Sequence, residues 1–75
     1  MSNVQIVLDV LNRGKDVILP DRNVYTQVGG YFCRIIDNEE TTLYVQINPE
    51  DIEFATLCEQ LSKNSLRKLK EMANG

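Results

Sequence analysis

The sequence predicts an α+β fold with an N-terminal helix, a three- to four-stranded antiparallel meander, and two C-terminal helices packed on one face of the sheet. Three observations lead to this prediction. Apolar residues recur every three or four positions near the N-terminus, alternate at every second position through the middle, and return to helical spacing near the C-terminus. The chain has 75 residues, 43% hydrophobic and 25% charged, so we expect one domain spanning residues 1–75.

Residues 2–13 are predicted to form an amphipathic helix. Apolar residues at i, i+3, i+4 and i+7 from Val4 share one face. Ser2 followed by Gln5 has the spacing of a capping box, and Gly14 suits a left-handed C-terminal cap. Further apolar residues lie off the main stripe. We therefore expect this helix to be clamped between the sheet and another element.

The period changes to two after the first helix. Pro20 ends the first run because it cannot donate a ladder hydrogen bond, and the Gly29-Gly30 pair suits a two-residue hairpin. An alternative is that the first two runs are one short strand and an irregular loop. The four predicted strands are residues 17–19, 24–28, 31–37 and 41–47.

Two helices are predicted after the sheet. The first is expected to start at residues 48–51, where Asn48 suits the N-cap, Pro49 the first turn, and two carboxylates the helix dipole. The apolar step from Leu61 to Leu66 is five residues, which breaks the helical register. A second helix is therefore expected to begin near residue 64 or 65.

The composition argues against most catalytic chemistry. The chain has no histidine, which removes an essential member of Ser-His-Asp and Cys-His sites and of the common zinc sites. Gly29-Gly30 is too short to cradle a phosphate. We expect no enzymatic activity, no metal and no cofactor. Cys33 and Cys58 are expected to be reduced and buried as small hydrophobic residues.

The N-terminal sequence and the apolar runs bear on localisation. Residues 1–3 lack the basic start of a signal peptide. No apolar run reaches the ~18 residues needed to cross a bilayer. We expect a cytoplasmic protein without membrane partners.

Charge is unevenly distributed, although the net charge is only −3. Acids at helix starts and bases at helix ends can simply complement the helix dipoles. A functional alternative is an acidic surface that steers a basic partner and sets its register. Residues 37–59 contain no Lys or Arg but seven acids: Asp37, Glu39, Glu40, Glu50, Asp51, Glu53 and Glu59.

The strand alternation predicts an aromatic outer face. If Cys33 and Ile35 face the core together with residues 43, 45 and 47, the intervening side chains point outward. Aromatic residues with an arginine are typical of the centre of a protein interface. Alternatives are that the third helix covers this face, or that the register is shifted and the rings are core. The predicted anchors are Tyr25, Phe32, Arg34, Ile36 and Tyr44, and the predicted acidic rim is Glu39, Glu40, Glu50, Asp51 and Glu53.

Residues 61–71 resemble the turn and recognition helix of helix-turn-helix DNA-binding proteins, although the turn glycine of that family is missing. The resemblance implies a DNA-binding regulator that places polar and basic side chains near phosphates. An amphipathic helix with a solvated Lys/Arg face has the same pattern. The residues implied are Lys63, Asn64, Ser65, Arg67, Lys68 and Lys70.

These patterns favour a small protein-interaction module that acts by stoichiometric binding. In size, acidity and element order the chain resembles small phage and mobile-element proteins, including acidic inhibitors of host nucleic-acid enzymes. That resemblance implies a partner with a basic surface. The alternatives are the DNA-binding regulator and a structural homodimer formed through the same sheet face or edge.

Overall fold

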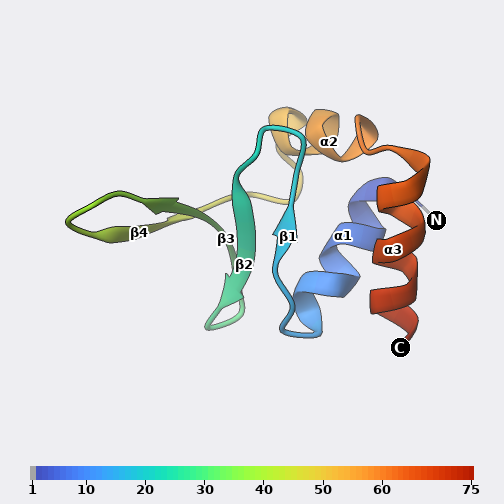
Figure 1. Cartoon of the computed structure of the whole chain (residues 1–75), viewed down its shortest axis with the longest axis horizontal. Coiled ribbons are helices and arrows are strands. Elements are labelled where there is room, and N and C mark those ends of the chain that lie inside the picture. Colours follow the sequence, from blue (N-terminus) through green and yellow to red (C-terminus); the bar gives the residue numbers. More distant parts are fainter. Residues whose placement is uncertain (1) are drawn as a thin grey trace.

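The computed structural model describes residues 2–75 and has the predicted α+β architecture (Figure 1). One antiparallel sheet has the strand order β1-β2-β3-β4, so each strand pairs with its neighbour in the sequence. The meander is thus four-stranded, and the alternative of an irregular loop is wrong. The elements are α1 (Asn3–Asn12), β1 (Val17–Ile18), β2 (Val24–Val28), β3 (Tyr31–Asp37), β4 (Thr42–Gln46), α2 (Ile52–Glu59) and α3 (Lys63–Asn74).

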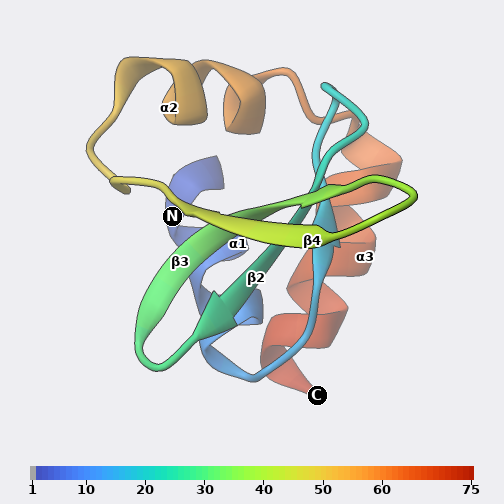
Figure 2. The same cartoon turned by 90° about the vertical axis from the view of Figure 1, so that its left-hand side faces the viewer.

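Helix α1 lies at the centre of the molecule, which confirms the expectation that it is clamped on two sides. It contacts β1 and β2 on one side and α3 on the other, while α2 lies across the top of the molecule in Figure 1. Figure 2 shows β4 nearest the viewer, with α1 and α3 behind the sheet and α2 above it. The buried core draws on every helix and on the first two strands: Ile6, Val7, Val10, Leu11, Val17, Leu19, Tyr25, Phe54, Cys58 and Leu69.

Local hydrogen bonds explain where α1 begins and ends. The Ser2 hydroxyl accepts the Gln5 backbone N–H at 3.2 Å. The Gln5 side chain donates to Asp9 at 2.8 Å instead of turning back to the backbone N–H of Ser2. The part of the predicted capping box that involves the Gln5 side chain is therefore wrong. Gly14 has φ +79°, the left-handed conformation predicted for the helix end.

The C-terminal helices begin at other residues than predicted. The Asp51 carboxylate caps α2 by accepting the Glu53 N–H at 3.1 Å. Residues 48–51 form a turn instead, in which the Asn48 carbonyl accepts the Asp51 N–H at 2.9 Å. The Ser62 hydroxyl caps α3 by accepting the Ser65 N–H at 3.1 Å. Within this turn the Asn48 side-chain oxygen accepts the Glu50 N–H at 2.9 Å, so it does not cap α2.

Both cysteines are free thiols, and both are buried as predicted. Cys58 lies in the core between α1 and α2. Burial raises the pKa of the Cys58 thiol to about 11, and the Glu59 charge adds to the shift. Among residues 2–75, no helix combines the length and the apolar character that a membrane crossing requires.

Candidate binding surface

Strand register divides the sheet into an inner and an outer face. Residues paired across antiparallel strands share a face, so Val17, Tyr25, Arg34 and Val45 lie together. Val17 and Tyr25 belong to the buried core, which identifies this face as the one against the helices. We call it the inner face: Val17, Leu19, Tyr25, Gln27, Phe32, Arg34, Ile36, Leu43, Val45 and Ile47.

The predicted orientation of four anchors is therefore wrong. Tyr25 is 2% exposed, and its ring lies 5.9 Å from that of Phe54 on α2. Phe32 packs against the core, while Arg34 and Ile36 are half-buried on the same inner face. These residues do share one face, as the alternation required. The sequence pattern does not specify which face the helices cover, because both faces are apolar and alternation alone cannot distinguish them.

Buried Tyr25 is tied into a polar cluster. Its hydroxyl donates to the Asp21 carboxylate at 2.6 Å, and Asp21 also accepts the Asn23 backbone N–H at 3.1 Å. Burial and the bond to Asp21 raise the pKa of Tyr25. Burial alone would raise the pKa of Asp21, but the hydrogen bonds and the Arg34 charge outweigh it and hold the pKa below its usual value. The Arg34 Nε is buried without a hydrogen-bond partner in the described chain.

The outer face carries an apolar row that crosses all four strands. Ile18 pairs with Val24, Val24 with Ile35, and Ile35 with Tyr44. We call Ile18, Val24, Ile35 and Tyr44 the outer-face row. Ile18 is 67% exposed and Tyr44 56% exposed, so its two ends are open to solvent. Tyr44 is thus the one predicted anchor that does point outward.

A second outer pair extends this surface. Val28 and Tyr31 face each other across the Gly29-Gly30 hairpin, and Tyr31 is 59% exposed. Cys33 also lies on the outer face, contrary to prediction, although its neighbours bury it. Two of the three tyrosines therefore lie exposed on the outer face, while the third is core.

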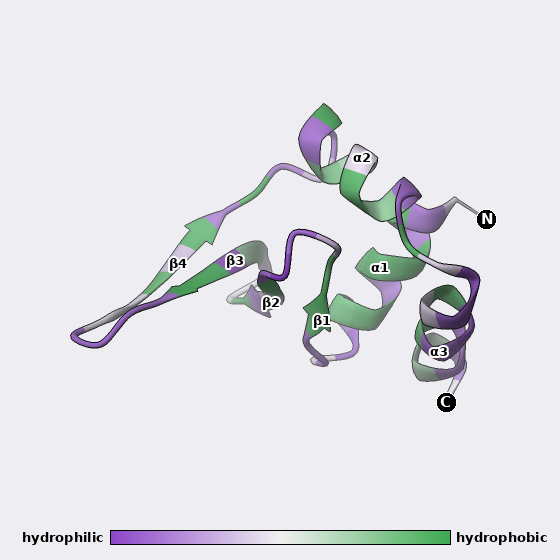
Figure 3. Cartoon of the chain, turned by 45° about the horizontal axis from the view of Figure 1, so that its top comes forward, coloured by the Kyte–Doolittle hydropathy of each residue, from purple (hydrophilic) through white to green (hydrophobic). Residues whose placement is uncertain are grey.

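The β3–β4 hairpin projects from the body as an arm (Figure 1). We use "arm" for residues 36–45. Every residue of β4 is exposed, and three consecutive apolar side chains, Leu43, Tyr44 and Val45, alternate between the two faces. Figure 3 shows hydrophobic residues along the two strands and hydrophilic ones at the tip. The arm is therefore apolar on both faces where no helix covers it.

Acidic side chains occupy the tip of the arm. Asp37, Glu39 and Glu40 are exposed there. The Asn38 side chain holds the turn by accepting the N–H groups of Glu40 at 3.0 Å and Thr41 at 2.9 Å. The arm is therefore apolar along its strands and acidic at its tip.

The predicted acidic rim does not form one continuous surface. Glu39 and Glu40 lie at the tip, whereas Glu50, Asp51 and Glu53 lie at the start of α2, on the body of the molecule (Figure 1). The Asp51 carboxylate serves as the helix cap. Only the tip acids adjoin the exposed apolar residues of the arm.

The residues of the DNA-binding alternative lie on α3. A connection of residues 60–62 joins α2 to α3, as in a helix–turn–helix. Ser65 is half-buried, and its backbone N–H is taken up by the helix cap. The other five implied side chains are exposed: Lys63, Asn64, Arg67, Lys68 and Lys70.

Sequence reasoning missed much of this surface. Ile18, Val24 and Tyr31 were not proposed as contact residues, and Leu43 and Val45 were expected to be core. The two-residue hairpin pairs Val28 with Tyr31 and so puts Val24 and Ile35 on one face, but it does not indicate that the helices leave this face uncovered. The described residues contain no group of three or more metal-ligating side chains.

The chain has no match among protein-family models, curated proteins or solved structures.

Proposed function

We propose that the protein is a stoichiometric protein-binding module that engages its partner through the arm, the outer-face row and the Val28–Tyr31 pair that extends it. The observation that carries this proposal is the uncovered apolar surface around Tyr44. A small soluble domain normally buries such side chains, and a contiguous exposed patch marks an interaction site. Aromatic residues at the centre of a contact contribute most of its binding energy.

The open edge of β4 adds a second means of contact. The Ile47 N–H donates to the Phe32 carbonyl at 2.9 Å, and the Asn38 N–H to the Thr41 carbonyl at 3.0 Å, which fixes the phase of the ladder. Tyr44 then directs its own N–H and C=O toward the free edge. The strand sequence TLYVQ contains no charge and no proline, the usual protections of an edge. A partner strand can therefore pair with β4.

The acidic tip supports a partner with a basic rim. Three carboxylates beside an apolar contact raise the association rate with a positive surface and oppose association with a negative one. Nucleic-acid-handling proteins carry such surfaces. By occupying one, the module would act as an inhibitor or modulator of its partner, in the manner of the phage and mobile-element proteins that it resembles.

Capture from an extract of the native source, followed by titration of the purified partner, tests this proposal. The double variant Tyr31→Ser with Tyr44→Ser should lose capture, whereas the control Lys63→Ser, on α3, should retain it. We expect one partner per chain and an affinity lowered at least about 30-fold, since two aromatic anchors contribute ~2 kcal/mol or more. Equal capture by the double variant would refute the proposal. Sedimentation of the free protein as a dimer that the same variant dissociates would assign the surface to self-association instead.

DNA binding is a second candidate, favoured by the stripe of cations on α3. Lys63, Arg67 and Lys70 are exposed at i, i+4 and i+7, so they share one face of the helix. Phosphate contacts would make the affinity fall steeply with salt. The double variant Arg67→Ala with Lys68→Ala should then abolish retardation of duplex DNA at low salt. Absence of any retardation by the wild type at low salt would eliminate this candidate.

A further inference from the structure

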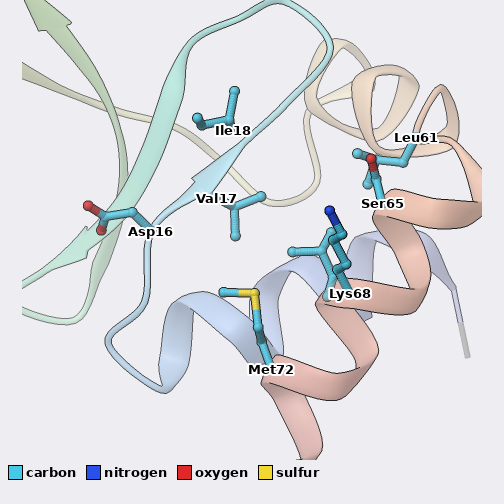
Figure 4. Close-up of a pocket in the computed structure, with 8 residues that line it drawn as sticks. Asp16, Val17, Ile18, Leu61, Ser65, Lys68 and Met72 are labelled. Carbon is cyan, nitrogen blue, oxygen red and sulfur yellow. The ribbon is translucent and has the colours of Figure 1, made fainter.

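A cavity of about 260 Å³ lies between the edge strand β1 and helix α3 (Figure 4). Val17 and Leu69 form its buried floor, and Leu61 and Met72 line its sides. In Figure 4 the Val17 and Met72 side chains point toward each other. The surface is apolar and stays open to solvent between the strand and the helix.

The backbone of β1 presents unpaired groups to this cavity. β1 is the edge strand of the sheet, with β2 on one side only. The Leu19 N–H donates to the Asn23 carbonyl at 3.2 Å, so Leu19 directs its backbone groups toward β2. Alternation then directs the N–H and C=O of Ile18 to the opposite side, where α3 lies. A donor and an acceptor for one further strand therefore lie beside an apolar cavity.

The shape and chemistry of the cavity favour a peptide segment. Small-molecule sites enclose about 300–1,000 Å³ and bury most of their ligand, whereas this cavity is smaller and open along the strand. An extended peptide that pairs with an edge strand places alternate side chains into pockets and obtains its affinity from backbone hydrogen bonds.

Charge specifies the flanking residues of that peptide. Lys68 lies at the rim of the cavity. Asp16 also lines the cavity, but its carboxylate points away from α3 (Figure 4). A ligand running between β1 and α3 therefore meets one cation, Lys68, on its helix side.

We propose that this groove binds an extended segment of another protein, in which acidic residues flank an apolar one. The segment adds to β1 by pairing with the Ile18 backbone, and its apolar side chain fills the space between Val17 and Met72. An acidic side chain pairs with Lys68. This site is separate from the arm, although Ile18 contributes its backbone here and its side chain to the outer-face row.

The experiment titrates the isotopically labelled full chain with a synthetic peptide pool and follows backbone amide shifts by NMR. The pool alternates glutamate with an equimolar mixture of Val, Ile, Leu, Phe and Tyr. At about 1 mM peptide, the range of a weak contact, we expect shifts centred on Val17, Ile18 and Met72. The same pool with N-methylated backbone amides should give none of these shifts, because it cannot pair with the strand.

Three variants separate this groove from other surfaces. Lys68→Glu should weaken binding about fivefold or more, while the matched charge reversal Lys63→Glu, outside the cavity, should change it less than twofold. Tyr44→Ser, which disables the arm, should leave the titration unchanged. Absence of shifts at Val17, Ile18 and Met72, equal binding of the N-methylated pool, or equal effects of the two charge reversals would each overturn the proposal.

Discussion

The Tyr25 hydroxyl donates a 2.6 Å hydrogen bond to the Asp21 carboxylate, joining a core aromatic ring to the turn that precedes its own strand. Asp21 accepts two further bonds from Asn23, at 3.1 Å from the backbone and 3.0 Å from the side-chain amide. The ring end of Tyr25 packs near Phe54, so one side chain couples the β1–β2 turn to helix α2. Because Tyr25 is buried by these contacts, it cannot serve as a partner anchor.

Removing that hydroxyl should destabilise the fold and change its acid sensitivity. Tyr25→Phe should lower the free energy of unfolding by about 1 kcal/mol at pH 7, because Asp21 loses a charge-assisted bond but remains partly solvated. The depressed pKa of Asp21 stabilises the fold above its unfolded-state pKa, and this contribution is lost as pH falls through the folded-state value. The variant should therefore lose less stability between pH 5 and pH 2, about the range expected for such a carboxylate.

Urea unfolding across that pH range measures both effects. Tyr31→Phe is the matched control, because Tyr31 is exposed and its hydroxyl has no hydrogen bond within the described residues. It should change neither the stability nor its pH dependence. Identical urea unfolding curves for Tyr25→Phe and Tyr31→Phe at every pH would show that the Tyr25–Asp21 hydrogen bond contributes nothing to stability.

Alkaline conditions should destabilise the protein through Cys58. Its pKa is raised to about 11 in the folded state, above the ordinary value of 9.0. The resulting stabilisation is complete below the unfolded-state pKa and is lost as pH rises toward the folded-state value. Burial also raises the pKa of the Tyr25 hydroxyl, so ionisation of Tyr25 should destabilise the fold further at still higher pH.

The free energy of unfolding should therefore fall between about pH 9 and pH 11, by at most ~1.4 kcal/mol per unit for one group. Cys58→Ala should be less stable at pH 7, because it leaves a cavity in the core. Its stability should nevertheless depend less steeply on alkaline pH. If the free energy of unfolding fell equally steeply with pH in the variant and the wild type, the alkaline destabilisation could not be assigned to Cys58.

Core and outer aromatic residues should differ in their effect on stability. Phe54→Ala should lower the free energy of unfolding by about 3–5 kcal/mol, since Phe54 is buried against Tyr25. Tyr44→Ala should lower it by less than about 1 kcal/mol, because its ring is more than half exposed. Denaturant titration of both variants makes the comparison. A large loss for Tyr44→Ala would mean that the ring supports the fold rather than a contact.

The start of α3 should depend on one serine. Ser62→Ala removes the hydroxyl that accepts the Ser65 N–H and should lower the free energy of unfolding by about 1 kcal/mol. Ser65→Ala keeps that backbone donor and should have a smaller effect. Thermal unfolding monitored by circular dichroism compares the two. The cap assignment fails if Ser65→Ala is the more damaging change.

Much of the fold could be predicted from the sequence because its signals are local. The helical spacing from Val4, the glycine pair at the hairpin and the turn after Pro20 each act over a few residues. The start of α2 could not be predicted in the same way, since Asn48 and Asp51 both suit an N-cap and only the chain path after β4 selects Asp51. The local sequence therefore allows two N-cap positions for α2.

The binding surface was less predictable because it depends on which face α1 covers. Alternation grouped Tyr25, Phe32, Arg34 and Ile36 correctly. It could not show that α1 and Phe54 pack on that group, since this choice involves residues distant in the sequence. Tyr44 was assigned to their face, but its register partner is Ile35. The pairing across the longer β3–β4 turn fixes that register, and the sequence pattern alone does not specify it.

Oxidative footprinting of the three tyrosines, with and without the captured partner, tests the central claim most directly. In the free protein, hydroxyl radicals should modify Tyr31 and Tyr44 readily and Tyr25 hardly at all. Addition of the partner should protect Tyr44 most strongly and leave Tyr25 unchanged. Protection of Tyr44 in the free monomer, or equal modification with the partner bound, would contradict a binding surface on the arm.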